Sequence, residues 1–425
     1  MKPGPDLTRR PNSERRFDRP HRPLGLRAAN HAGWVLHRVR HETLGLEPEQ
    51  LVEAARRQRG HTDLDVLAER PDSHVEALAA LTGSLEQEAD LTPVGRYFAR
   101  GQIVGSLINR LELASLRQER PEIAQLELAP PLVIVGLPRS GTTFLQHLLA
   151  RDPDHRVLQH WEAARPAAPR GPADEEAAMR ATDRSLRLLD YLAPDARVLH
   201  PVDTRDPTEC VTLFSNSLAS LELATMHQVP SYLAWCLGGD LSGAYYEYAL
   251  QLRVLQAAQR RPRWLLKSPA HLFWLDQLQR VLPEPRLIQI HRDPLEVLGS
   301  FCSLAAVLSG ISSNRVDVEA LGRRWAPTWA LGLERARIAR RAWSPQRAVD
   351  VEYTSLVADP MGEVQRIYDH FGLELGPQAR RSMEAFLGSH PQHAGGVHRY
   401  SLEQFGLDSR EEAVRFATDR AEPVA

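Results

Sequence analysis

The chain has 425 residues, of which 43% are hydrophobic and 25% charged, and its formal net charge is −2. This composition is typical of a globular protein with about two to three domains, or of one large domain with insertions. The near-zero charge excludes a global attraction to nucleic acid or to an anionic membrane, so any anion site must be local. We expect no membrane-spanning segment and no secretory signal, and therefore a cytoplasmic location. The three scattered cysteines form neither a disulfide framework nor a metal-binding pair.

Lysine is almost absent from the sequence. Only Lys2 and Lys267 occur, against fifty arginines, a bias typical of a GC-rich bacterial genome. Where nearly every cation is a guanidinium, an internal lysine indicates a task that arginine cannot perform, such as acting as a compact point charge or a proton donor. Lys267 is therefore a candidate functional residue.

The first third of the chain predicts a tail followed by helices. Residues 1–28 are rich in proline and arginine without an apolar period, which indicates a disordered or loosely attached tail. Residues 29–130 have helical patterning, and Thr92-Pro93 has the residue types of an N-cap followed by a first helical position. We expect a helical region packed against the domain that follows.

A strand, a glycine loop and a helix follow from residue 131. The apolar run 132–135 leads into a loop with Gly136 and Gly141 at its ends, and then into a helix with apolar residues on one face. Backbone N–H groups and the helix dipole then surround one point, which suits a phosphate or sulfate. The spacing is that of a Walker A loop, but Thr142 stands where the lysine belongs. This substitution disfavours a triphosphate and favours a shorter anionic chain held partly by Arg139.

The middle of the chain predicts a helical insertion. A short segment around Val157 has the pattern of a strand or a turn, and residues 164–262 are rich in alanine, leucine and arginine with several proline breaks. We expect this insertion to cover the active-site face and to select the substrate. The α/β domain that contains it spans residues 131–405.

Two further strands end in cations. Residues 263–267 form an apolar run that ends in Lys267, and residues 286–291 form another that is followed by Arg292. A helix then starts at Asp293-Pro294 and carries Ser300 in its second turn. Ligands of open parallel sheets bind at the carboxyl ends of the strands, so these cations and Arg139 are expected in one crevice.

The last part of the domain contains one more strand and helix. The strand lies at residues 348–353, and the helix opens at Asp359-Pro360. Residues from 390 onward are loop-like and able to fold back over a bound ligand. Residues 406–425 are expected to be a C-terminal tail.

Taken together, the motifs resemble those of one enzyme family. Gly-Leu-Pro-Arg139-Ser-Gly-Thr-Thr and Ile-His-Arg292-Asp-Pro with Ser300 resemble the two nucleotide motifs of sulfotransferases that use 3′-phosphoadenosine 5′-phosphosulfate. The likeness is to the large bacterial type, related to the tyrosylprotein and heparan sulfotransferases. Leu-Leu-Lys267-Ser-Pro-x-His271 and Glu-Tyr353-x-x-Leu also fit. The resemblance covers about residues 131–401 and implies a P-loop-like α/β fold. Its central parallel sheet is flanked by helices, with an N-terminal helical extension and a helical insertion.

The resemblance also implies a donor and a role for each matching residue. The co-substrate is 3′-phosphoadenosine 5′-phosphosulfate, and no metal is required. The residues expected to hold its 5′-phosphosulfate are Arg139, Ser140, Gly141, Thr142 and Thr143. Those expected near the rest of the nucleotide are Arg292 and Ser300 at the 3′-phosphate, Tyr353 at the adenosine and Arg399 closing over a phosphate. Lys267 is expected to stabilise the bridging oxygen as it becomes anionic.

A general base must take the proton of the acceptor hydroxyl. In the tyrosylprotein and heparan enzymes this is a glutamate about twenty residues beyond the loop, and Glu162 stands 23 positions after Arg139. His271 is the second candidate, because cytosolic relatives use a histidine just after the corresponding lysine strand. His200 and Glu209 border the insertion, where contact with the substrate is the alternative, but both are expected to be structural.

Two other functions stay open at this point. A small-molecule kinase or other P-loop phosphotransferase would use ATP and Mg²⁺, but the loop lysine and a clear Walker B acid are missing. A nucleotide-binding protein without catalysis is the third hypothesis. For a sulfotransferase, the acceptor is a hydroxyl or amine of a small molecule, sugar or lipid, and no nucleic acid is expected as a partner.

Overall fold

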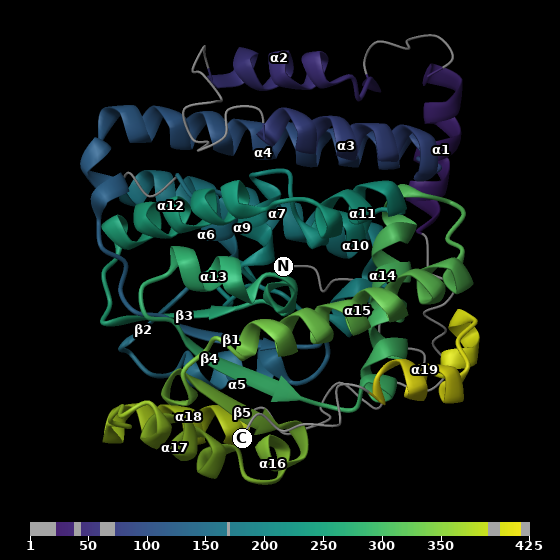
Figure 1. Cartoon of the computed structure of the whole chain (residues 1–425). Helices are drawn as coiled ribbons and strands as arrows, with labels where there is room; N and C mark the ends of the chain where they lie inside the picture. The colour runs from purple at the N-terminus through teal and green to yellow at the C-terminus, as the bar shows by residue number, and fades with distance from the viewer. Residues whose placement is uncertain (1–22, 38–43, 60–72, 168–170, 390–399, 418–425) are drawn as a thin grey trace.

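The computed structural model describes residues 23–37, 44–59, 73–167, 171–389 and 400–417. Its centre is a five-stranded sheet in the order β2-β3-β1-β4-β5, in which every neighbouring pair is parallel. The strands are β1 (Leu132–Gly136), β2 (His155–Val157), β3 (Arg263–Lys267), β4 (Arg286–His291) and β5 (Ala348–Glu352). The sheet lies between helical layers (Figure 1), which confirms the predicted α/β fold with a central parallel sheet.

Both faces of the sheet are buried. In β1, Leu132 and Ile134 belong to one apolar cluster, whereas Val133 and Val135 belong to another. Successive side chains of a strand point to opposite faces, and a parallel sheet covered on both faces reads as a continuous apolar run. The run of residues 132–135 has this pattern.

One face is covered by helices that follow β1 and β5. Their apolar side chains share a cluster with Leu132 and Ile134. These helices are α5 (Thr142–Leu149), α16 (Tyr353–Ala358), α17 (Pro360–His370) and α18 (Pro377–Ser389).

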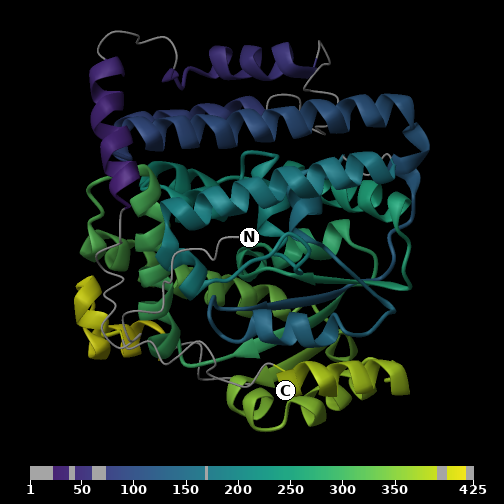
Figure 2. The same ribbon diagram turned by 180° about the vertical axis from the view of Figure 1, so that it is seen from behind.

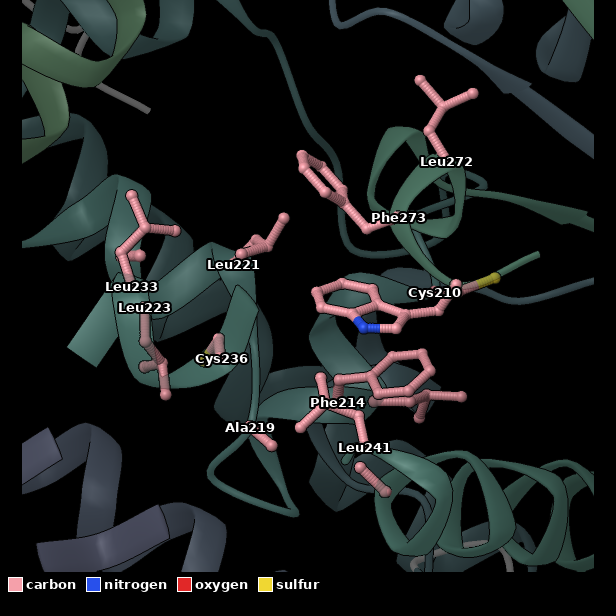
Figure 3. Packing of buried hydrophobic residues seen from close by; sticks show 14 of the residues in the cluster. Cys210, Phe214, Ala219, Leu221, Leu223, Leu233, Cys236, Leu241, Leu272 and Phe273 are labelled. Atoms are coloured by element: carbon pink, nitrogen blue, oxygen red, sulfur yellow. The ribbon is translucent and has the colours of Figure 1, made fainter. Parts of the chain in front are cut away.

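The other face carries the larger core. Its inner helices and short turns are η6 (Pro269–Phe273), α13 (Leu275–Val281), α14 (Pro294–Ser312) and α15 (Val318–Arg340), and the turn η7 (Pro345–Arg347) before β5 has no buried residue. The helices that lie within or next to the expected insertion are α6 (His160–Ala164), α7 (Pro172–Leu192), α8 (Pro194–Leu199), α9 (Val211–Ser215), α10 (Leu221–Met226), α11 (Pro230–Gly238) and α12 (Ser242–Ala258). Phe214 of α9, Phe273 of η6 and Leu233 of α11 contribute to one continuous core, part of which Figure 3 shows. This packing attaches the insertion to the sheet.

The N-terminal helices form an outer layer. They are α1 (Leu24–His37), α2 (Pro48–Arg59), α3 (Ser73–Glu88), α4 (Pro93–Glu119) and the turn η5 (Pro121–Gln125). Figures 1 and 2 both show α3 and α4 beyond the insertion helices as seen from the sheet. The side chain of Thr92 caps α4 by accepting from the Gly95 N–H, as its sequence predicts. Helix α1 begins within the expected tail, so residues 24–28 are helical rather than disordered.

The end of the chain also differs from its expectation. The described part of the expected tail 406–425 contains α19 (Ser409–Arg415), and the turn η8 (Leu402–Phe405) precedes it. Phe405 and Phe416 are buried in the larger core, which anchors this segment. Phe405 and Phe416 do not form a regular helical pattern of apolar residues, so the sequence did not predict that this segment packs against the core.

Helix α14 is long and apolar enough to cross a membrane, by length and composition alone. In the described structure 78% of its apolar window is buried, and it packs against α15 and α4. A helix that is apolar all round and enclosed by other elements is a core helix, and we interpret α14 in this way.

Candidate active site

The loop between β1 and α5 has the backbone of an anion site. Gly136, Arg139 and Gly141 have φ angles of 149°, 70° and 94°, in the region that favours glycine. A Cβ atom on Gly136 would lie 2.6 Å from the carbonyl oxygen of Ile290, and one on Gly141 would lie 2.9 Å from the ring of Tyr353. No side chain caps the start of α5. In the described part of the chain, the first N–H groups of α5 therefore remain available to an anion.

Arg139 joins this loop to the second predicted motif. Its Nε donates to the Ser300 hydroxyl at 3.1 Å, and a terminal nitrogen donates to the Leu199 carbonyl at 2.9 Å. The Arg139 carbonyl oxygen accepts from the Arg292 guanidinium at 2.9 Å. Burial is the largest influence on the Arg139 guanidinium and lowers its pKa. The two motifs, far apart in sequence, therefore form one cationic site.

Arg292 leaves the end of β4 and lies over an aromatic ring. Its guanidinium carbon is 4.0 Å from the centroid of the Tyr353 ring, and its Nε donates to Glu296 at 3.1 Å. Glu296 thus pairs with Arg292, while Asp293 caps α14 by accepting from the Leu295 N–H. The guanidinium is stacked on the aromatic ring, so a cation and an aromatic face are available at the same place.

Lys267 lies at the carboxyl end of β3, on the side of the sheet that faces α5. Leu265, two residues earlier, packs into the α5 cluster, and the alternation of a strand puts Lys267 on the same face. Its side chain is only 1% exposed. The ammonium donates to the Thr143 hydroxyl at 3.1 Å and to Glu209 at 2.6 Å. Lys267 therefore supplies the cation that the Walker-like loop lacks.

Glu209 is the acidic partner of Lys267, although its sequence position led us to expect a structural role. The backbone N–H of Cys210 donates to the Lys267 carbonyl at 2.9 Å, so the Glu209 loop is bound to the end of β3. Its side chain is 25% exposed and lines a cavity, together with His160 and His200. Burial lowers the pKa of His200 to about 4, which keeps its imidazole neutral near pH 7. No motif in the sequence distinguishes Glu209 from the other carboxylates of the insertion.

The cavity has a volume of about 1010 Å³ and two chemically different ends. One end is formed by the loop around Arg139, with Arg292 and Tyr353. The other end is enclosed by helices α4, α7, α10 and α14, with apolar side chains such as Phe98, Leu189 and Leu308. Glu209 and the loop lie in the same cavity wall, so a reacting hydroxyl and an anionic donor have room to meet.

The structure places neither predicted base in the cavity wall. Both oxygens of Glu162 accept from Arg156, at 2.9 and 2.5 Å, and one also accepts from the Gln159 N–H at 2.9 Å. Glu162 is thus the third residue of a helix-capping box and half of a buried ion pair. This geometry disfavours Glu162 as the base, because Arg156 holds both of its oxygens and the side chain is only 6% exposed.

His271 is equally poorly placed. It is 1% exposed, its Nδ1 lies 2.9 Å from the Tyr245 hydroxyl, and Phe214 and Tyr248 surround its ring. Burial lowers the pKa of His271 to about 3, far below the range in which a base works near pH 7. Its aromatic surroundings make it part of the core.

The remaining predicted residues divide into three groups. Arg139, Gly141, Thr142, Thr143, Arg292 and Tyr353 line the cavity. Ser140 and Ser300 are buried behind that wall. Ser300 is the partner of Arg139, and the Ser140 hydroxyl has no hydrogen-bond partner among the described residues. Arg399 lies outside the described residues. Among the described residues, no group of three or more His, Cys, Asp or Glu side chains could hold a metal ion.

Comparison with known proteins identifies the family. Residues 130–377 match the sulfotransferase family. The omega-hydroxy-beta-dihydromenaquinone-9 sulfotransferases Stf3 of Mycobacterium tuberculosis and Mycobacterium bovis are 24% identical over 305 residues, which is 65% of this chain and 71% of theirs.

Two solved structures are similar over most of their length. Sulfotransferase STF1 of Mycobacterium tuberculosis has a TM-score of 0.75 and 32% identity, covering 87% of this chain and 98% of that one. Sulfotransferase STF9 of Mycobacterium avium has a TM-score of 0.76 and 26% identity, covering 87% and 95%. These comparisons support neither the kinase hypothesis nor the non-catalytic hypothesis. The chain belongs to the sulfotransferase family.

Proposed function

We propose that the sulfuryl donor is 3′-phosphoadenosine 5′-phosphosulfate and that it binds where the three strand-end cations meet. The uncapped start of α5 and Arg139 suit a 5′-phosphosulfate, and Lys267 adds a charge beside Thr143. Arg292 suits the separate 3′-phosphate, and the Tyr353 ring beneath it suits the flat adenine. The observation that carries the proposal is the convergence of these cations on a single loop.

Transfer is an in-line displacement in this proposal. The acceptor oxygen forms a bond to sulfur, and the bond from sulfur to the bridging oxygen breaks, so that the 5′-phosphate leaves with the electron pair. Lys267 stabilises the negative charge on that oxygen, as fixed cations do in other group transfers. The acceptor proton passes to a carboxylate.

We propose Glu209, in place of Glu162 or His271, as the general base that takes this proton. Glu209 lines the cavity and lies 2.6 Å from the Lys267 ammonium, between the loop and the helical end. A base must lie within hydrogen-bond reach of the proton it takes, and the cavity gives Glu209 that access. When Lys267 turns to the bridging oxygen, one oxygen of Glu209 becomes available to accept the proton.

The proposed acceptor is a hydroxyl group on a largely apolar molecule of the lipid class. Most of the cavity beyond Glu209 is enclosed by apolar side chains of α4, α7, α10 and α14. A pocket of this kind binds ligands mainly through apolar contact, with a few polar groups fixing their orientation. The name of the Stf3 relatives describes sulfotransfer to a menaquinone derivative, which supports the same class of acceptor here.

The test is transfer of labelled sulfate from the donor to a panel of lipid alcohols, small phenols and sugars, using the wild type and Lys267→Arg. We expect transfer to a lipid alcohol, and a loss in the variant of about 100-fold to 1000-fold, because a guanidinium is larger and flatter than the buried ammonium that contacts Thr143 and Glu209. Donor-dependent transfer restricted to sugars would contradict the acceptor class, and full activity of Lys267→Arg would contradict the role of the lysine.

A further inference from the structure

The helical end of the cavity has an apolar mouth. Tyr97 of α4 and Leu188 of α7 both line the cavity, although their exposed fractions are 68% and 50%. Side chains that contact both the cavity and the solvent mark an opening. Phe98 and Leu189, their neighbours in sequence, continue the apolar surface inward.

More exposed apolar side chains surround this mouth. Tyr191 lies one turn beyond Leu188 on α7, and a Cβ atom on Gly25 of α1 would lie 2.1 Å from the Tyr191 hydroxyl. Leu24 therefore belongs to the same edge. We call the four side chains Leu24, Tyr97, Leu188 and Tyr191 the apolar rim. They are half of the eight strongly exposed large apolar side chains found among the described residues. A cluster of this kind indicates an interaction surface.

The chemistry of the rim favours a lipid surface. Two of its four members are tyrosines, whose ring and hydroxyl suit the boundary between hydrocarbon and water. Exposed arginines adjoin the rim, namely Arg27 on α1 and Arg184 one turn before Leu188 on α7, whereas the nearby acids Asp183 and Asp190 of α7 are each paired with another arginine. Apolar side chains flanked by arginines are the composition of surfaces that lie on anionic bilayers.

We propose that the apolar rim docks on a lipid bilayer, so that the acceptor enters the cavity without crossing water. The inference rests on the proposed function in that the acceptor is apolar. It also follows from the continuity of the rim with the apolar interior through Tyr97 and Leu188. The edge formed by α1, α4 and α7 is then the face turned toward the membrane.

The experiment is flotation of the full chain with phosphatidylcholine vesicles containing about one third phosphatidylglycerol. The test variant is Leu188→Asp with Tyr191→Asp. The matched control is Ile338→Asp with Val414→Asp, which changes two exposed apolar side chains, 54% and 76% exposed, on α15 and α19. We expect the wild type and the control to float with the vesicles and the rim variant to lose about tenfold or more in binding.

Three outcomes would overturn the proposal. The first is absence of wild-type binding, and the second is equal binding by the rim variant. The third is a dimeric wild type with a monomeric rim variant in light scattering, because a second copy of the chain would then cover the rim. Flotation needs neither donor nor turnover. The flotation assay therefore tests docking even if the proposed sulfotransfer fails. The transfer assay likewise tests the proposed function even if docking fails.

Discussion

The two ends of the cavity are built in different ways. The donor end consists of residues at or just beyond the carboxyl ends of β1, β3 and β4. Their contacts are polar, from Arg139 to Ser300 and from Lys267 to Thr143. The acceptor end consists of helices α4, α7, α10 and α14, which line the cavity mainly with apolar side chains. In the proposed function, short local motifs therefore hold the anionic donor, whereas tertiary packing selects the acceptor.

The largest effect is expected where the two ends meet. Glu209→Gln should lower turnover by about 100-fold to 10,000-fold, because the acceptor proton loses its base. Calorimetry with adenosine 3′,5′-bisphosphate should give unchanged or tighter binding, since a negative charge next to Lys267 is removed from an anion site. Normal turnover, or a loss of nucleotide affinity that explains the lower activity, would refute the role of Glu209 as the base.

Glu162→Ala should affect stability in place of catalysis. Arg156 and Glu162 are 3% and 6% exposed, so the change leaves a buried arginine without its partner. We expect the free energy of unfolding to fall by about 3–5 kcal/mol, measured by urea denaturation. Glu53→Ala breaks the exposed pair with Arg57 and should cost less than about 1 kcal/mol. Turnover per folded Glu162→Ala molecule should stay close to that of the wild type, and loss of turnover without loss of stability would return the base to Glu162.

A smaller effect on the free energy of unfolding is expected on acidification. It comes from His227, which lies between α4 and α14. Burial lowers the pKa of His227 to about 4, and the side chain is 1% exposed. Between pH 6.5 and this value the unfolded chain binds a proton that the folded chain does not, so stability falls as the pH falls. The slope is about 1.4 kcal/mol per pH unit for one histidine. His227→Gln should reduce the pH dependence of unfolding by this amount between about pH 6.5 and 5, and an unchanged slope would contradict the assignment.

The sequence predicted the donor end more fully than the acceptor end, for physical reasons. The loop from Gly136 to Thr143 and the Asp293-Pro294 helix start are local patterns, in which spacing alone determines which groups come together. Parallel strands then align their carboxyl ends, which explains why Arg139, Lys267 and Arg292 were expected in one crevice.

The base assignment depended on contacts that spacing does not encode. Glu162 has the position expected from the related enzymes, but Arg156, only six residues earlier, holds its carboxylate. Glu209 reaches Lys267 through a loop contact between Cys210 and the end of β3, across more than fifty residues of chain. The apolar rim likewise combines α1, α4 and α7, and no single stretch of sequence carries its pattern.

The central claim is that Arg292, stacked on Tyr353, binds the 3′-phosphate of the donor while the loop binds the 5′ end. The direct test is calorimetry of Arg292→Ala with adenosine 3′,5′-bisphosphate and with adenosine 5′-phosphate. Loss of a charge-assisted hydrogen bond should weaken the bisphosphate by about 10-fold to 150-fold. Affinity for the 5′-phosphate should change little. Equal losses for both nucleotides would contradict the account.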